Sequence, residues 1–371
     1  MRKIKVLFDN QIFVNQKFGG VSRYYTELFK HFDVSKMIDW RIIAFFSRNI
    51  YLNESFDKLV KFNVEGWDFK GSKRLINFLN KLLYYLFLIF KKLDINICHI
   101  TYYSPYYLDK FIKKGVPVVV TVYDMIHEIY NGDIKTIQEK RYVINNADLI
   151  LAISQSTAND IIKYYNVPKD RIVVTHLASS LNPDKAVYMN ELPSKYILYI
   201  GLRDWYKNFN GFINAINPLI VNNEDLYVLC AGGPQFTKSE LLLFKELGIE
   251  NRVVWHPINN DSQLASFYKQ ALFFVFPSKY EGFGIPILEA MNCDCPVALS
   301  ETSSLKEIAD YAGFYFNPYS EESIKNACAE LVSSSKLRDN LILQGKRRRK
   351  DFSWELTSQK TFEAYQKLVN A

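Results

Sequence analysis

Short apolar runs rich in Val and Ile alternate with longer segments of helical periodicity along the first half of the chain. The runs do not alternate polar with apolar residues, so they predict strands covered on both faces, as in a parallel sheet. Strands that alternate with helices are typical of βαβ units. The predicted segments are Ile4–Phe8, Val21–Phe32, Trp40–Phe46, Lys73–Lys92, Ile95–Ile100, Val116–Val122, Lys135–Asn146, Leu149–Ile153, Ala158–Tyr165 and Ile172–Thr175.

A second series of the same kind follows residues 181–194, a polar stretch with two prolines and no periodicity. Such a stretch is typical of an interdomain linker. The strands predicted after it are Tyr196–Ile200, Leu226–Cys230, Val253–Trp255, Phe273–Phe276, Pro296–Leu299 and Phe314–Phe316, and a last helix is predicted over Ser353–Val369. The pattern therefore predicts two doubly wound α/β domains.

Length and composition agree with two domains. A chain of 371 residues exceeds what one hydrophobic core usually organises, and a hydrophobic share of 49% suffices for two cores. The chain opens on a predicted strand and shows no Arg-led apolar signal segment, which favours a cytoplasmic protein. Its five cysteines form no Cys-x-x-Cys pair, so we expect reduced thiols in the cores.

The net charge of +7 permits an anionic partner without naming it. The densest basic run, residues 346–350, has no interleaved aromatic residues. We interpret it as the solvated end of a helix and expect no nucleic-acid partner.

The segment Lys73–Lys92 combines basic residues with many aromatic and aliphatic ones. Its uninterrupted apolar stretch, Leu82–Phe90, has nine residues, too few for a bilayer, which takes about 20. One interpretation is a buried helix of the first domain. The other is an interfacial helix on an anionic membrane, as an enzyme with a lipid-linked acceptor would need. The sequence leaves both open.

The most informative stretch is Glu281–Met291, in which two acids lie eight positions apart around a Gly-x-Gly turn. The turn follows a predicted strand and opens a predicted helix, so it lies at the carboxyl edge of a sheet. Gly282 and Gly284 allow the backbone to approach a ligand, and the helix start near Gly284 suits a phosphate. Glu289 could accept hydrogen bonds from a ribose diol. A capped helix with acids that complement its dipole is the structural alternative.

This stretch resembles the E-x7-E motif of family 4 of the retaining glycosyltransferases, which have the GT-B fold. The segment from Ser303 to Ala309 is also similar to the family, although Lys306 replaces a proline and no glycine precedes Asp310. The resemblance implies two Rossmann-like domains that face each other across a cleft, with a C-terminal helix that crosses back to the first. The implied domains are 1–180 with 353–371 on the acceptor side, and 195–352 on the nucleotide-sugar side.

Other segments carry the same resemblance, and those of the first domain are similar to a bacterial surface-polysaccharide branch that includes mannosyltransferases. Many relatives have His where this chain has Tyr123, and His127 could replace that imidazole. The resemblance implies catalytic roles for Glu281, Arg203, Lys207 and His127; donor contacts from Glu289, Gly282, Phe283, Gly284, Ile285 and Gly232; and acceptor-side contacts from Gly19, Gly20, Arg23, Tyr24, Tyr102, Tyr103 and Asp124.

The implied reaction moves a hexosyl unit, with mannose from GDP-mannose favoured, from a nucleoside diphosphate sugar to a hydroxyl of a glycan or lipid-linked saccharide in O-antigen or capsule synthesis. A front-face mechanism without metal or other cofactor is implied, and the place would be the cytoplasm or the inner face of the plasma membrane. A nucleotide-sugar epimerase, a glycan phosphorylase and a non-catalytic glycan-binding or nucleotide-binding protein are the alternatives. The sugar, base, linkage, acceptor and oligomeric state stay open.

Overall fold

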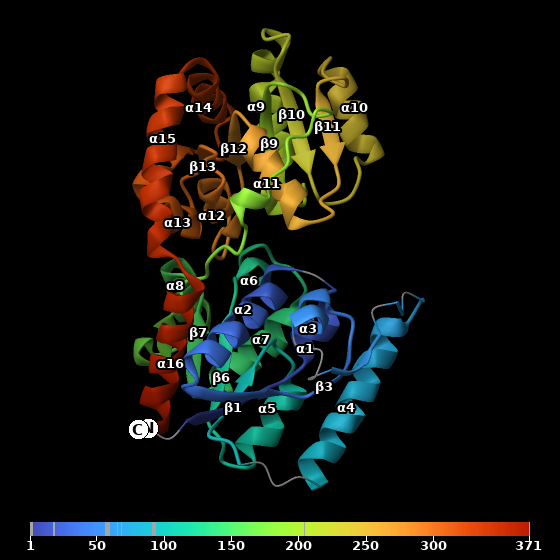
Figure 1. Ribbon diagram of the computed structural model, residues 1–371, viewed down its shortest axis with the longest axis vertical. Coiled ribbons are helices and arrows are strands. Elements are labelled where there is room, and N and C mark those ends of the chain that lie inside the picture. Colours follow the sequence, from blue (N-terminus) through green and yellow to red (C-terminus); the bar gives the residue numbers. More distant parts are fainter. Residues whose placement is uncertain are drawn as a thin grey trace. The chain divides into compact units, whose positions relative to one another are not determined.

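The computed structural model of the protein describes residues 3–17, 19–55, 60–64, 66–67, 69–90, 94–203 and 205–370. The chain forms two compact units (Figure 1). Unit 1 comprises Met1–Leu177 together with Trp354–Ala371, and unit 2 comprises Ala178–Ser353. Unit 2 thus includes the residues 181–194 that were expected to form a linker. No described helix is long and apolar enough to span a bilayer.

Unit 1 is built on a six-stranded parallel sheet with the strand order β2-β1-β5-β6-β7-β8. The strands are β1 (Ile4–Phe8), β2 (Ile38–Ile42), β5 (Ile97–Ile100), β6 (Val118–Val122), β7 (Leu149–Ala152) and β8 (Ile172–Val174). The helices are α1 (Gln11–Asn15), α2 (Gly20–Ser35), α3 (Ile50–Ser55), α4 (Ser72–Phe90), α5 (Pro105–Ile112), α6 (Ile126–Ile129), α7 (Ile134–Asn146) and α8 (Gln155–Tyr165). Every residue of β5, β6 and β7 is buried, as the continuous apolar runs predicted.

One predicted segment of unit 1 needs correction. The run Trp40–Phe46 is not one strand, because the main sheet ends at Ile42 and a separate strand β3 (Ala44–Ser47) pairs with β4 (Val60–Asn63). Apolar residues on both sides of the break concealed it from the sequence pattern. The helix predicted over Lys73–Lys92 is α4, and the predicted positions 91 and 92 lie outside the described residues.

The chain ends on α16 (Trp354–Asn370), which belongs to unit 1 and packs against α2. Figure 1 shows this red helix in the same unit as the blue first strand. Trp354 packs on Tyr24 of α2, and the Tyr365 hydroxyl lies 2.5 Å from Nδ1 of the buried His99. These contacts confirm the predicted return of the last helix to the first domain.

Unit 2 has a second six-stranded parallel sheet with the order β11-β10-β9-β12-β13-β14. The strands are β9 (Tyr196–Ile200), β10 (Tyr227–Ala231), β11 (Val253–His256), β12 (Phe273–Phe276), β13 (Val297–Ser300) and β14 (Phe314–Phe316). The helices are α9 (Phe209–Val221), α10 (Lys238–Glu246), α11 (Asp261–Gln270), α12 (Ile285–Asn292), α13 (Ser303–Ala309), α14 (Glu321–Ser333) and α15 (Ser335–Arg348). Counted within the unit, the order is 3-2-1-4-5-6, that of the Rossmann fold.

Candidate functional site

The strand order of unit 2 places two predicted motifs side by side. The chain leaves β9 toward β10 on one side and leaves β12 toward β13 on the other, so the switch point of the sheet lies between β9 and β12. The Arg203–Lys207 loop follows β9, and the Glu281–Gly284 loop follows β12. Open α/β sheets bind ligands at the carboxyl ends of strands at such a point. A backbone hydrogen bond of 2.8 Å from Lys279 to Tyr206 joins the two loops.

Lys207 and Glu281 form an ion pair at this point. The Lys207 Nζ donates to Glu281 Oε1 at 2.6 Å, with side-chain exposures of 20% and 12%. The ammonium also lies 5.0 Å from the ring centre of Tyr206 and 5.7 Å from that of Phe276. The limited solvent access makes the charges interact more strongly than they would in water. A cation and a carboxylate are therefore held together where a ligand would lie.

The start of α12 is shaped for close backbone approach. Gly284 is the N-cap residue with φ of 105°, and a Cβ there would lie 3.0 Å from Ile287 Cδ1 and 3.1 Å from Leu305 Cδ2. A side chain at this position would be strained as well as crowded. The helix dipole gives α12 a positive N-terminus suited to a phosphate, although Pro286 has no amide hydrogen and the Ile287 amide donates to the Gly284 carbonyl at 2.9 Å.

Two serines missed by the sequence reasoning hold the preceding loop in shape. Ser303 Oγ accepts from the Glu281 amide at 2.9 Å, and Ser304 Oγ donates to the carbonyl oxygens of Glu281 and Phe283 at 2.8 and 2.9 Å. The Phe283 ring packs against Phe352. The sequence signal for these serines was their place in the segment from Ser303 to Ala309 that resembles the family. Serine hydroxyls commonly form hydrogen bonds with the backbone groups of loops.

Glu289 lies inside α12 and is 9% exposed. Its Oε2 accepts a hydrogen bond of 3.1 Å from the hydroxyl of Tyr268 on α11, which also donates to the carbonyl of Pro286. Burial, and then the Glu289 charge, raises the pKa of Tyr268 well above its usual value, so the phenol stays a donor. Tyr268 therefore orients the carboxylate that was predicted to bind ribose.

Arg203 does not join the Lys207–Glu281 pair. Its Nε donates to Glu240 of α10 at 2.6 Å, and its Nη2 donates to the carbonyl oxygens of Pro234 and Gln235 at 2.7 and 3.0 Å. Burial alone would raise the pKa of Glu240, but hydrogen bonds from Arg203 and Thr237 lower it overall. This guanidinium therefore ties the β9 loop to the loop after β10, and its contact with a phosphate stays a prediction.

The loop held by Arg203 contains the predicted Gly232. Its φ is 70°, its amide donates to the His256 carbonyl, and a Cβ there would lie 2.9 Å from Ile258 Cδ1. The next residue, Gly233, has φ of 63°, and a Cβ would lie 2.6 Å from the carbonyl oxygen of Gly201. Gly232 thus lets the loop after β10 pack against the loop after β11, and Gly233 lets it pack against the loop after β9.

In unit 1, an ion-pair network positions the loop after β6. Lys140 of α7 donates to Glu128 at 2.9 Å and to the Asp124 carbonyl at 3.0 Å, and the side chains of Lys140 and Glu128 are 2% and 3% exposed. The Tyr165 hydroxyl donates to the other oxygen of Glu128. His127 lies in the same helix as Glu128, and its Nδ1 accepts from the Asp133 amide at 3.2 Å. The network fixes α6, the helix that carries His127.

Several predicted acceptor-side tyrosines lie in the core of unit 1. Tyr24 is fully buried and Tyr103 is 4% exposed, whereas Tyr102 is half-buried. The Tyr123 hydroxyl donates to Tyr25 at 2.8 Å and to the Thr101 carbonyl. We revise the predicted ligand contacts of Tyr24 and Tyr103, because their hydroxyls and rings are used in packing. Gly19 caps α2, Gly20 begins it, and the Arg23 guanidinium lies over the Tyr51 ring at 4.9 Å.

Asp9 is a buried acid that the sequence reasoning missed. It follows β1 and accepts from the backbone and side chain of both Gln11 and Thr101, which joins the carboxyl ends of β1 and β5. Burial raises the pKa of Asp9 to about 6 against the lowering effect of these bonds. The sequence signal that could have identified Asp9 was its position directly after the first predicted strand.

His99 provides a pH-dependence prediction. Burial lowers its pKa from 6.5 to about 3, so below pH 6.5 the unfolded chain binds a proton that the folded chain rejects. Stability should therefore fall as pH falls from about 6.5 to about 3, by at most about 1.4 kcal/mol per pH unit. The raised pKa of Asp9 acts with the opposite sign between 3.8 and about 6.

Urea unfolding of the wild-type chain and of His99→Gln at a series of pH values separates the two groups, because Asp9 is common to both proteins. We expect the stability difference to shrink as the solution is acidified. Parallel stability curves would contradict the assigned titration of His99.

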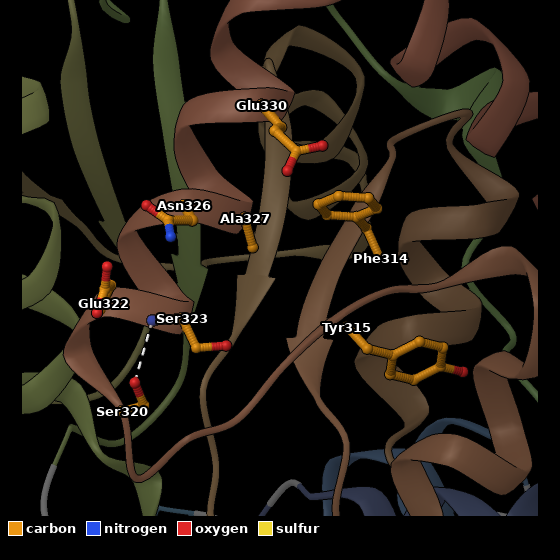
Figure 2. A pocket seen from close by; sticks show the side chains of 8 residues that line it. All are labelled: Phe314, Tyr315, Ser320, Glu322, Ser323, Asn326, Ala327 and Glu330. Atoms are coloured by element: carbon orange, nitrogen blue, oxygen red, sulfur yellow. Dashed lines mark hydrogen bonds between the residues drawn. The ribbon is translucent and has the colours of Figure 1, made fainter.

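A cavity of about 410 Å³ lies between β14 and α14 (Figure 2). It is lined by Phe314, Tyr315 and Asn326 among others, and none of the predicted site residues borders it. Within the described ranges, no group of three or more His, Cys, Asp or Glu side chains could hold a metal ion.

Comparison with known proteins assigns both halves of the chain. The model described as "Glycosyltransferase Family 4" matches residues 18–178, and "Glycosyl transferases group 1" matches residues 184–348. The chain is 32% identical to O-antigen chain mannosyltransferase B of Escherichia coli over 241 residues, 61% of this chain and 62% of that protein. It is 28% identical to O-antigen chain mannosyltransferase RfbU of Salmonella typhimurium over 48% of this chain and 49% of that protein. These matches thus span less than two thirds of either relative.

Solved structures agree on the fold. A glycosyltransferase from Rickettsia africae covers 99% of both chains with a TM-score of 0.73 at 18% identity. Anabaena HepE, in complex with UDP and glucose, has a TM-score of 0.73 at 14% identity and covers 97% of this chain and 98% of its own. The chain therefore belongs to family 4 of the glycosyltransferases and has the two Rossmann-like domains of the GT-B fold.

Proposed function

We propose that the protein transfers a hexosyl unit from a nucleoside diphosphate sugar to a hydroxyl of a glycan or lipid-linked saccharide, with retention of configuration, in surface-polysaccharide synthesis. Mannose from GDP-mannose is the favoured donor, because the relatives compared above are named mannosyltransferases. The observation that carries the proposal is the ion pair of Lys207 and Glu281 beside the start of α12.

The chemistry of this corner suits departure of a diphosphate. When the bond from the anomeric carbon to the diphosphate breaks, negative charge grows on the phosphate oxygen, and a fixed positive group aimed at that charge lowers the barrier. Lys207 and the amides at the start of α12 are such groups. We propose that a bound diphosphate takes the ammonium of Lys207 from Glu281. The released carboxylate then accepts hydrogen bonds from the sugar hydroxyls.

The acceptor hydroxyl must lose its proton as it attacks. In the front-face route that we propose, the leaving phosphate oxygen takes that proton, so no enzyme carboxylate becomes a nucleophile and no metal is needed. Glu289, oriented by Tyr268, is proposed to bind the ribose. Asp124 and His127, which the Lys140 network holds in place, are proposed to contact the acceptor.

Arg203 is also proposed to position the donor loops. Its ion pair with Glu240 and its bonds to two carbonyl oxygens fix the loop that contains Gly232. Its Nη1 is buried without a hydrogen-bond partner among the described residues. Arg203 would then support donor binding by holding the loop that contains Gly232 in shape.

A donor screen followed by a transfer assay tests the proposal. GDP, UDP, dTDP and their sugars are first tested for thermal stabilisation, since a ligand at 100 times its Kd stabilises by about 2.7 kcal/mol. Release of the nucleoside diphosphate is then followed with and without a mannosyl-terminated acceptor, and NMR gives the anomeric configuration of the product. Turnover without an acceptor would favour an epimerase, and binding without nucleotide release would favour a non-catalytic protein.

A further inference from the structure

Helix α4 is apolar on two faces, and only one of them is covered. Ile76, Asn80 and Tyr84 are fully buried, four residues apart, on the face toward β3 and α1. Asn80 anchors this face, because its side-chain amide accepts from the Phe46 amide at 3.0 Å and donates to the Phe46 carbonyl at 2.9 Å. The orientation of the helix on unit 1 is therefore fixed.

The second apolar face is exposed. It consists of Leu75 (41% exposed), Phe78 (64%), Leu82 (45%), Tyr85 (42%) and Leu86 (38%). The spacing of three and four residues aligns these side chains in one stripe along the helix, which we name the α4 stripe. Isolated exposed apolar residues are ordinary, but a contiguous stripe of this length marks an interaction surface. Figure 1 shows α4 at the outer edge of unit 1.

Aromatic side chains continue the surface at the N-terminal end of the helix. Trp67 is 36% exposed and Phe69 is 54% exposed, and their ring centres lie 6.1 Å apart. Tryptophan and other amphipathic aromatic residues are favoured at the boundary between water and hydrocarbon.

The charges around the α4 stripe have one sign. Within α4 the charged residues are Lys73, Arg74 and Lys81, and the helix contains no acid. Arg74 and Lys81 are seven positions apart and therefore lie on the same side of the helix, along one border of the stripe. Lys81 also lies 5.2 Å from the ring centre of Tyr106.

We propose that the α4 stripe docks on the surface of a bilayer that contains anionic lipids, with α4 parallel to the membrane plane. Apolar side chains would enter the boundary between headgroups and acyl chains, while the flanking cations meet lipid phosphates. A second copy of the chain fits less well, because a two-fold contact through this face would bring its cations together. A nucleic acid also fits less well, because its charged phosphates would lie against the exposed leucines of the α4 stripe. The proposal does not depend on which sugar is transferred.

Vesicle flotation of the full-length chain tests the proposal. We expect the wild type to float with phosphatidylcholine vesicles that contain phosphatidylglycerol, less so at high salt, and weakly with phosphatidylcholine alone. The variant Phe78→Ser/Leu82→Ser should lose at least about tenfold in vesicle affinity. The variant Arg74→Gln/Lys81→Gln should lose about fivefold per charge, on the anionic vesicles only.

The matched control is Leu241→Ser/Leu242→Ser on α10, where the replaced leucines are 50% and 60% exposed but lie in unit 2. It should float like the wild type, and all variants should have wild-type circular dichroism and bind the nucleotide donor with unchanged affinity. The proposal fails if the wild type does not float or if the stripe variant floats equally well. A dimer that dissociates on Phe78→Ser/Leu82→Ser, without flotation of the wild type, would assign the stripe to a second copy. Donor binding is measured separately, so this failure is distinct from failure of the proposed transferase.

Discussion

Replacement of Lys207 with Ala should lower kcat for sugar transfer by about 10²–10³-fold, the usual cost of removing one preorganised group that stabilises developing charge. The reason is its position, 2.6 Å from Glu281 at the switch point of the unit 2 sheet and next to the N-terminus of α12. The measurement is release of the nucleoside diphosphate at saturating donor with a mannosyl-terminated acceptor. Glu281→Gln should also lose turnover, because the neutral amide is a weaker acceptor than the carboxylate that is proposed to bind the sugar hydroxyls.

Lys195→Ala is the matched control. Lys195 immediately precedes β9, at the opposite end of the strand that leads to Lys207, and forms an exposed pair with Asp225 at 3.1 Å. Lys195 carries the same charge as Lys207, and its replacement should leave kcat unchanged. If Lys207→Ala turns over like Lys195→Ala, the assignment of Lys207 as the cation for the leaving group is wrong.

Lys140→Met should destabilise unit 1 by about 3–5 kcal/mol, which is the usual effect of removing one partner from a buried ion pair. The side chains of Lys140 and Glu128 are 2% and 3% exposed, so the substitution leaves the carboxylate buried without its cation. Urea unfolding monitored by circular dichroism measures the change.

Two controls keep this test specific. Lys135→Met lies on the same helix, but Lys135 is 80% exposed and lies 3.9 Å from Glu139, so it should cost less than about 1 kcal/mol. The double variant Lys140→Met/Glu128→Gln should recover part of the loss, because the orphaned charge is removed. Equal destabilisation by Lys140→Met and Lys135→Met would show that the network contributes little.

The sheets and the loop before α12 could be predicted because their determinants are local. Continuous apolar runs specify strands covered on both faces, and the glycines around Phe283 specify the turn before α12. The resemblance to the family implied that Lys207 and Glu281 share one site, and each follows a predicted strand of the same domain. Strand order then brings them together, since β9 and β12 are neighbours.

The partner of Arg203 could not be predicted, because Glu240 lies 37 residues away and the side-chain direction depends on how the loop after β10 packs. Lys140 was missed for a related reason. A lysine in an amphipathic helix normally predicts a solvated position, and only the fold places Glu128 against it. Ligand contacts of Tyr24 and Tyr103 were expected from the resemblance to the family, but tyrosines, as large rings with a polar hydroxyl, also fill cores.

The two interpretations of the segment Lys73–Lys92, which contains most of α4, show a third limit of prediction from the sequence. Helical periodicity identifies apolar faces but does not say which face the rest of the chain covers. The burial of Ile76, Asn80 and Tyr84 accounts for one face, and the exposure of Phe78 and Leu82 identifies the other.

Calorimetric titration of GDP-mannose, or of whichever nucleotide sugar the donor screen selects, tests the donor site most directly. We expect saturable binding to the wild type and to Lys195→Ala with equal affinity, and at least about tenfold weaker binding to Lys207→Ala, since loss of one charge-assisted bond to a diphosphate costs about 1.5–3 kcal/mol. Equal affinity of the wild type and Lys207→Ala would contradict a diphosphate site at the start of α12.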